Sequence, residues 1–234
     1  MRKIFLLPVV LLTASTGWAQ ASSYFDAAQA YNRLMIERNS NALTRVGAFK
    51  VQGTPYLFGE RQTADVYAKG ETGLKETISY NTFNQQLEIQ LAGQNDLIKK
   101  ELAGIDSFRL IKGAETPYKE DLLFINAAHA GGTEKTFLQV MRKGARFSLY
   151  KAYRTTLEIS TTNYVQADLR VFELNYDYYY TDAQRAGMKK IKKSADQVRK
   201  EFKAVKDLSS FAALESFAQN PDEALVALFN LLNN

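Results

Sequence analysis

Residues 170–180 read RVFELNYDYYY, and this stretch decides how the rest of the chain is interpreted. Large apolar side chains occupy every second position from residue 172, and the positions between them are mainly polar. Because successive side chains of a strand point to opposite faces, the pattern predicts a long strand with one aromatic and one solvated face. We expect a sheet and a following helix to pack on the aromatic face, which comprises Phe172, Leu174, Tyr176, Tyr178 and Tyr180.

Upstream of this strand, turn residues recur about every ten positions and β-forming residues fill the intervals. Short turns at residues 81–85 and 93–95 join neighbouring segments, which indicates an antiparallel meander. Gly144 allows the positive φ that a tight hairpin requires. The predicted strands cover residues 48–52, 63–68, 76–81, 86–91, 97–102, 107–112, 122–126, 134–142, 145–153 and 155–162.

Downstream, the period of the pattern changes. Apolar residues at positions 188, 191, 195, 198, 202 and 205 are three or four positions apart, which predicts an amphipathic helix. A short helix over residues 211–218 follows. The last helix begins at Asn220 and Pro221, with Asp222 and Glu223 in its first turn.

The predicted fold is therefore α+β. A mostly antiparallel, strongly bent sheet or partly closed barrel of about nine to eleven strands carries helices on one face. An N-terminal helix is expected over residues 22–41, with C-terminal helices packed on the sheet. Residues 20–234 are predicted to form a single α+β domain, β-rich over residues 47–180 and helical over residues 182–232.

Residues 1–19 have the features of a secretory signal peptide: Arg2 and Lys3, a short apolar run, and small residues before Ala19. Cleavage is expected after Ala19 or Ala21. The apolar run is shorter than the ~20 residues that span a bilayer. The chain has no cysteine, so an anchor through a lipid-modified cysteine is excluded. We expect an exported protein, either periplasmic or at the cell surface and extracellular.

Positive charge is concentrated in one segment. The chain carries a net charge of +5, whereas residues 185–206 contain nine basic and two acidic residues, a difference of +7. This segment has two interpretations: an electrostatic surface for anionic lipid headgroups, envelope polysaccharide or an acidic partner protein, or a solvated helix face. Nucleic acid fits the charge but not the compartment. The candidate surface residues are Lys189, Lys190, Lys192, Lys193, Arg199, Lys200 and Lys203.

The tyrosines of the long strand also allow two interpretations. Tyr176, Tyr178 and Tyr180 are candidates to line a ligand cavity, because a tyrosine ring offers an apolar face and a hydroxyl. Alternatively, they form core beneath the apolar stripe of the following helix.

The residue types that most enzymes need are scarce. His129 is the single histidine, so a Cys–His pair and a site with several histidine ligands are excluded. Glu173 and Asp177 share a strand face but would lie about 13 Å apart, too far for a glycosidase pair. No catalytic residue, metal ligand or cofactor is predicted, and a hydrolase using other carboxylates remains an alternative.

Several short motifs occur in a recognisable order. Residues 53–57 read GTPYL, and ADVY (64–67), YN (80–81) and LE (87–88) follow. Gly144, YK (150–151), the tyrosine-rich strand, the lysine-rich segment and DE (222–223) complete the series. The chain from Gly53 onward resembles a family of uncharacterised exported Bacteroidota proteins with a G-x-P-Y-L motif, a β-meander and C-terminal helices. The resemblance implies export and this architecture, and it implies no activity.

These observations lead to one functional expectation and two alternatives. We expect a non-catalytic exported protein that binds an envelope component or a partner protein, with peripheral membrane contact as one possibility. The alternatives are a carrier of a small ligand or lipid in a tyrosine-lined cavity, and the carboxylate-based hydrolase. The sequence predicts no oligomeric state.

Overall fold

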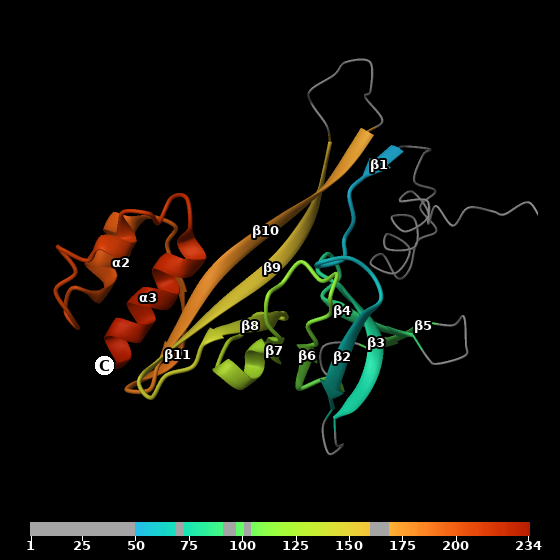
Figure 1. Cartoon of the computed structure of the whole chain (residues 1–234), viewed down its shortest axis with the longest axis horizontal. Coiled ribbons are helices and arrows are strands. Elements are labelled where there is room, and N and C mark those ends of the chain that lie inside the picture. Colours follow the sequence, from blue (N-terminus) through green and yellow to red (C-terminus); the bar gives the residue numbers. More distant parts are fainter. Residues whose placement is uncertain (1–49, 69–72, 91–96, 101–103, 160–168) are drawn as a thin grey trace, which may run out of the picture.

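Figure 1 shows the computed structural model of the chain, which describes residues 50–68, 73–90, 97–100, 104–159 and 169–234. Eleven strands form one sheet in the order β1-β10-β9-β8-β7-β6-β2-β3-β4-β5, and β11 also pairs with β10. The strands are β1 (Lys50–Gln52), β2 (Gln62–Tyr67), β3 (Leu74–Asn81), β4 (Gln86–Gln90), β5 (Leu97–Lys100), β6 (Ser107–Leu110), β7 (Leu122–Asn126), β8 (Phe137–Arg142), β9 (Phe147–Ile159), β10 (Leu169–Asp182) and β11 (Arg185–Ile191).

The predicted architecture is confirmed in outline. Every pairing between the described strands is antiparallel except that of β1 with β10, which is parallel. The sheet is open rather than barrel-like, because β1 and β5 end the strand order and do not pair with each other. The predicted N-terminal helix over residues 22–41 lies outside the described residues.

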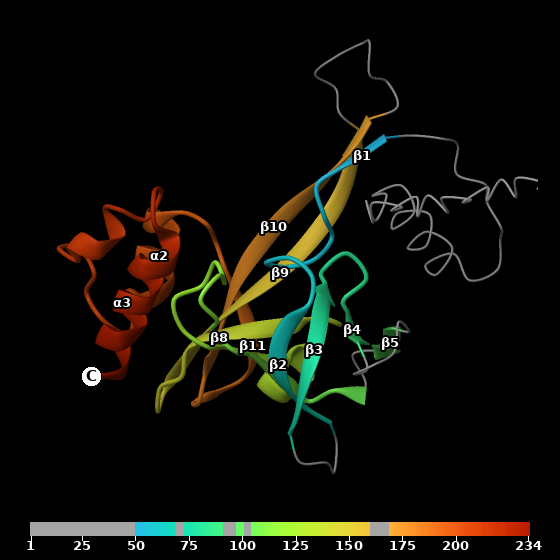
Figure 2. The same cartoon turned by 45° about the vertical axis from the view of Figure 1, so that its right-hand side comes forward.

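The described parts of the predicted strands at 145–153 and 155–162 form one continuous strand, β9. It pairs with β10 over thirteen positions, from Arg170 opposite Ile159 to Asp182 opposite Phe147. In Figures 1 and 2 this hairpin crosses the molecule, with the helices on one side and β2 to β6 on the other. The two strands therefore connect the helical part of the molecule to the rest of the sheet.

The first two predicted C-terminal helices are shorter than predicted, whereas the last helix matches its predicted extent. Helix α2 comprises Ala195–Phe202, a 3-10 helix η4 comprises Ala212–Leu214, and α3 comprises Pro221–Asn233. Pro221 opens α3 as the sequence predicts, although the side chain of Asn220 makes no capping hydrogen bond.

The predicted helix from residue 188 is wrong over its first turn. Residues 185–191 form β11, which places Ile191 opposite Tyr178 and Met188 opposite Thr181. Pairing with β10 supplies the backbone hydrogen bonds that a helix would otherwise provide. Ile191 enters the core beneath the helices, whereas Met188 packs on the other face of the sheet. The spacing of three between Met188 and Ile191 therefore places the two side chains on opposite faces of a strand, and not on one face of a helix.

Two large cores meet on one face of the β9–β10 hairpin. The helical core contains the buried Tyr178 and Tyr180 together with Ile191, Val198 and Phe202. The ring centroids of Tyr180 and Phe202 are 5.0 Å apart. The sheet core lies between β2, β3, β4, β6 and β7 and also includes Tyr153 of β9. Tyr176 is half-buried and packs against both cores, so it marks the seam between them.

The two faces of β10 differ from the prediction at two positions. Tyr179 belongs to the face expected to be solvated, yet it is buried in a third cluster with Tyr150, Ala152 and Leu138. The 3-10 helix η2 (Ala127–Ala130) contributes Ala127 to this cluster. Leu174 belongs to the expected aromatic face, yet 49% of it is exposed. It takes part in neither core, whereas Tyr178 and Tyr180 are covered by the helices.

The GTPYL motif forms a turn fixed to the β3–β4 hairpin. The carbonyl of Pro55 accepts hydrogen bonds from the amide and hydroxyl of Thr82, at 2.9 and 3.0 Å. The hydroxyl of Tyr56 donates to the buried Glu88 at 3.0 Å. Gly53 starts the turn with φ of +85°, in the left-handed region that favours glycine. The motif therefore has a structural role in this chain.

Replacing Gly53 with alanine should destabilise the protein by about 1–2 kcal/mol. The added Cβ would adopt a left-handed conformation and lie 3.1 Å from the carbonyl oxygen of Phe172. Gly59→Ala is a matched control, because Gly59 has φ of +98° but open space around its Cβ. Urea unfolding should give the larger loss for Gly53→Ala, and equal losses would show that the contact with Phe172 costs nothing.

Candidate functional site

A buried lysine lies where the two cores meet. Nζ of Lys151, on β9, donates to both carboxylate oxygens of Asp222, at 2.9 and 2.8 Å. The hydroxyl of Tyr178 donates to the same carboxylate. Lys151 and Tyr178 are opposite each other in the β9–β10 register, and Asp222 lies in the first turn of α3. These contacts fix the start of α3 to the sheet.

Three tyrosine rings surround the amine of Lys151. Nζ lies 4.2 Å from the ring centroid of Tyr176, 5.2 Å from that of Tyr153 and 5.5 Å from that of Tyr178. A cation near aromatic ring faces is stabilised by the ring quadrupoles. We call Lys151, Tyr153, Tyr176, Tyr178 and Asp222 the seam cluster. Its lysine already has a carboxylate and three rings as partners, which suits a structural role.

The hydroxyls of Tyr153 and Tyr178 hold their protons more strongly than an ordinary tyrosine does. Burial raises the pKa of Tyr178 above its ordinary value, and the hydrogen bond to Asp222 acts in the same direction. Burial also raises the pKa of Tyr153, followed by the negative charge of Asp222. Both side chains are therefore protonated at neutral pH and act as hydrogen-bond donors, not as general bases.

A pocket of about 430 Å³ opens beside the seam cluster. Tyr176 and Tyr178 contribute from the sheet, the buried Leu214 and Phe217 from the segment before α3, and the exposed Lys193 from the turn before α2. Nζ of Lys193 lies 4.6 Å from the ring centroid of Tyr176. We call this the aromatic pocket. It is mainly apolar and has one cation, Lys193, and one carboxylate, Glu215, at its rim.

A second hollow of about 400 Å³ lies on the other side of the turn, between the end of β11 and α2. Its cations are Lys190, Lys192 and Lys200, and its carboxylate belongs to Glu201. Glu201 accepts a hydrogen bond of 2.6 Å from the hydroxyl of Tyr180. We call this the basic groove. Its lining carries three cations and one carboxylate.

The structure separates the seven predicted basic residues into paired and free side chains. Lys190 and Lys193 bind Asp177, at 2.7 and 3.5 Å, and Arg199 binds Asp196 at 3.3 Å. Within the described part of the chain, the other four have no ion pair and are exposed. These four are Lys189, Lys192, Lys200 and Lys203. They come from β11, the turn and α2, so the basic surface is not one helix face.

The three predicted tyrosines also differ in position. Tyr178 and Tyr180 are core residues whose hydroxyls bind Asp222 and Glu201. Tyr176 and Tyr178 line the aromatic pocket, and Tyr180 does not. Ligand binding by these tyrosines stays a prediction.

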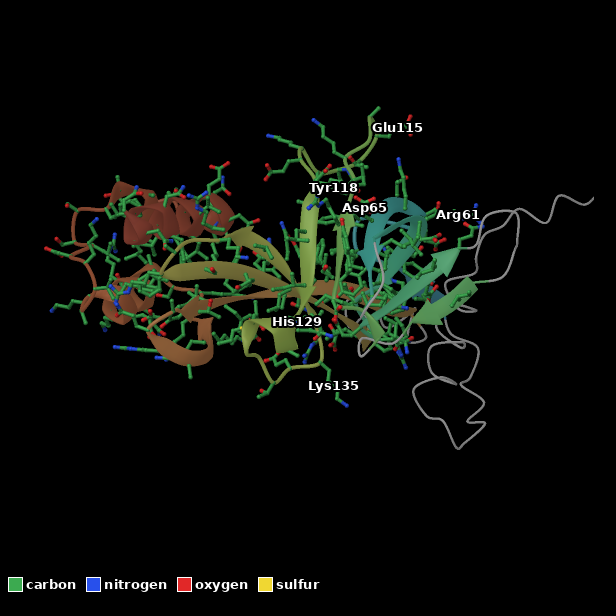
Figure 3. The ribbon with its side chains drawn as sticks, turned by 90° about the horizontal axis from the view of Figure 1, so that it is seen from below. Arg61, Asp65, Glu115, Tyr118, His129 and Lys135 are labelled. Atoms are coloured by element: carbon green, nitrogen blue, oxygen red, sulfur yellow. The ribbon has the colours of Figure 1, made fainter. Side chains whose placement is uncertain are left out.

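The other candidate groups do not converge. His129 is exposed, and its Nε2 lies 3.0 Å from Oδ1 of Asp106. It lies at one end of β7, whereas Tyr118 lies at the other end (Figure 3). Glu173 is exposed, and Asp177 is bound by two lysines. Among the residues that the structure describes, no group of three or more His, Cys, Asp or Glu side chains is placed to hold a metal ion.

The pairing of Lys151 with Asp222 is not predicted by any pattern in the sequence. Both residues appear in the motif series, but 71 positions separate them. The available signal was a lysine inside the otherwise strand-like segment of residues 147–153, FSLYKAY. A charged residue in a buried strand requires a partner, although the pattern does not identify it.

None of the helices in the described ranges is long and apolar enough to cross a membrane. Comparisons with protein-family models, curated proteins and solved structures gave no match to this chain.

Proposed function

We propose that the protein is an exported, non-catalytic binding protein of the cell envelope whose basic groove binds an acidic polysaccharide. The observation that carries this proposal is the pair of exposed lysines, Lys192 and Lys200, that face the groove without a carboxylate partner in the described chain. Lys190 adds positive charge although Asp177 binds it, and Glu201 is occupied by Tyr180.

The surroundings of the groove favour a polymer over a bilayer. The large apolar side chains that are exposed in the described chain are Leu74, Ile98 and Leu174, and none lies on β11 or α2. A peripheral membrane helix usually has an apolar face to insert beside its cations. An elongated polyanion needs only a hollow with free cations, which exchange bound counterions for the polymer's carboxylates.

The sequence supports the same compartment. The signal peptide predicted at residues 1–19 would deliver the chain to the envelope, where acidic polysaccharide is available. The scarcity of histidine and the absence of cysteine fit binding better than catalysis. The resemblance to exported Bacteroidota proteins supports export and adds no ligand.

Neutralising the free lysines should weaken binding to polygalacturonate. The Lys192→Gln/Lys200→Gln double variant should lose roughly tenfold to thirtyfold in affinity at low salt, at about 1 kcal/mol for each lysine near an anionic surface. Isothermal titration calorimetry at several salt concentrations would measure the affinity, which should fall as salt rises. The Lys119→Gln/Lys135→Gln variant is the control, since both lysines are exposed and outside the groove; Figure 3 locates Lys135.

The ligand controls separate the possible sources of anionic groups. Neutral dextran should not bind. Vesicles of phosphatidylglycerol and phosphatidylcholine should bind more weakly than polygalacturonate, and stronger vesicle binding would favour a membrane surface. If the two double variants bind polygalacturonate equally well, the groove is not the binding site.

A further inference from the structure

We infer that the aromatic pocket is a separate binding site for a small amphiphilic anion, with an apolar body and one carboxylate. The pocket lies across the Lys192–Ser194 turn from the basic groove and shares no lining residue with it. This inference does not depend on the proposed function of the groove.

The size and the lining of the pocket indicate a ligand with a small apolar body. A volume of about 430 Å³ lies within the range of roughly 300–1,000 Å³ typical of small-molecule pockets. Leu214 and Phe217 are buried residues that contribute to its lining, and Pro221 lies at the start of α3. The rings of Tyr176 and Tyr178 add aromatic surface. Such a lining favours an acyl chain or an aromatic ring over a strongly hydrated sugar.

The seam cluster gives the pocket a rigid wall. Tyr178 is buried, and its hydroxyl is held by Asp222. Tyr176 lies against the amine of Lys151, and its ring packs edge-on against that of Tyr178 at 5.5 Å. Because these rings are fixed before a ligand arrives, binding should order few additional side chains.

The positive charge of Lys193 at the rim favours a ligand with an anionic head group. Lys193 is 48% exposed, and its ion pair with Asp177, at 3.5 Å, is longer than the 2.7 Å pair that Lys190 makes with the same carboxylate. Lys193 can therefore turn toward a ligand while Asp177 keeps Lys190. The segment of residues 185–206 carries nine basic and two acidic residues, so the local field favours an anion.

One carboxylate at the rim disfavours an anionic ligand. Removing its charge should therefore strengthen the binding of an anion and weaken the binding of a cation. Glu215 lines the pocket and is exposed. If the ligand is an anion, Glu215 weakens its binding, whereas a cationic or zwitterionic ligand would use Glu215 as a partner.

Octanoate is the probe, and two-dimensional NMR titration of the isotopically labelled full chain is the measurement. Octanoate should perturb residues around Tyr176 and Phe217 and bind more tightly than octanol, its neutral analogue. Lys193→Gln should weaken octanoate binding about threefold to fivefold, and Glu215→Gln should strengthen it about twofold to threefold. Lys203→Gln is the control, because Lys203 is exposed and does not line the pocket.

A blocking variant tests the location without disturbing the core. Ala218 lines the pocket and is exposed, so Ala218→Trp should fill the pocket mouth, keep the thermal unfolding midpoint and weaken octanoate binding more than tenfold. The inference is overturned if octanol binds as well as octanoate, if Glu215→Gln weakens binding, or if Ala218→Trp folds normally and binds unchanged. Absence of octanoate binding to the unaltered protein at millimolar concentration would also overturn it. The Lys192→Gln/Lys200→Gln variant should bind octanoate normally, so failure at one site is distinguishable from failure at the other.

Discussion

Raising the pH above 10 should unfold the protein cooperatively, with a midpoint between about pH 11 and 12. Burial raises the pKa of Tyr80, Tyr153 and Tyr178 above the ordinary tyrosine value. Below pH 10 these hydroxyls are protonated in both the folded and the unfolded chain, so their contribution to stability is fully present. Above pH 10 the unfolded chain releases protons that the folded chain retains, and the stability falls.

The expected loss is large because at least three such tyrosines act together. Each retained proton costs about 1.4 kcal/mol for every pH unit above 10, so three cost about 4 kcal/mol per unit. A domain of ordinary stability has about 5–15 kcal/mol in total. Two pH units therefore remove much or all of it.

Tyrosine absorbance and far-ultraviolet circular dichroism, recorded over the same pH series, would test this. The buried tyrosines should ionise in one step together with the loss of secondary structure. Tyr153→Phe removes one of these groups and should reduce the slope of stability against pH by about one proton. Gradual ionisation near pH 10 with an intact fold would contradict the prediction.

Asp222→Ala should destabilise the protein by about 2–3 kcal/mol. The substitution leaves Lys151 buried without its carboxylate and removes the acceptor of the Tyr178 hydroxyl. Removing one member of a fully buried ion pair costs about 3–5 kcal/mol. The expected loss here is smaller because 44% of the Asp222 side chain is exposed and solvent screens the pair.

Three further variants isolate this effect in urea unfolding. Glu223→Ala removes the same charge from the same helical turn, but Glu223 is exposed, so the loss should stay below about 1 kcal/mol. Lys151→Met should cost less than Asp222→Ala, because water can solvate the remaining carboxylate. The double variant Lys151→Met/Asp222→Ala should be more stable than Asp222→Ala alone. Equal losses for Asp222→Ala and Glu223→Ala would show that the buried pair contributes little.

Local patterns predicted the strands well because period and turn position are local properties, although Gly144 does not adopt the positive φ expected of it. The predicted strand at 122–126 matches β7, and the predicted strand at 86–91 contains β4. The same reasoning failed at Met188 and Ile191. A spacing of three fits one helix face, and it also fits two faces of a strand when apolar clusters cover both. Only the tertiary structure shows that a helical core lies on one face of β11 and Tyr179 on the other.

The candidate sites were predictable in composition but not in arrangement. The excess of lysine was evident from the sequence, whereas the division into bound and free lysines depends on where β10 places Asp177. The aromatic pocket combines rings from β10 with Leu214 and Phe217, whose approach depends on how the segment before α3 crosses the sheet. The burial of Lys151 depends on a carboxylate that no local pattern connects to it.

The β9–β10 hairpin constrains how the two ends of the molecule can influence each other. Its thirteen consecutive pairs mean that a slip by one residue would turn every side chain to the opposite face and remove Tyr153 and Tyr178 from their cores together. The two strands therefore cannot slide past each other in the folded protein. A change at the helical end can reach the sheet core as a torsion of the ribbon about its long axis, and Tyr176, which packs against both cores, is the side chain best placed to respond to it.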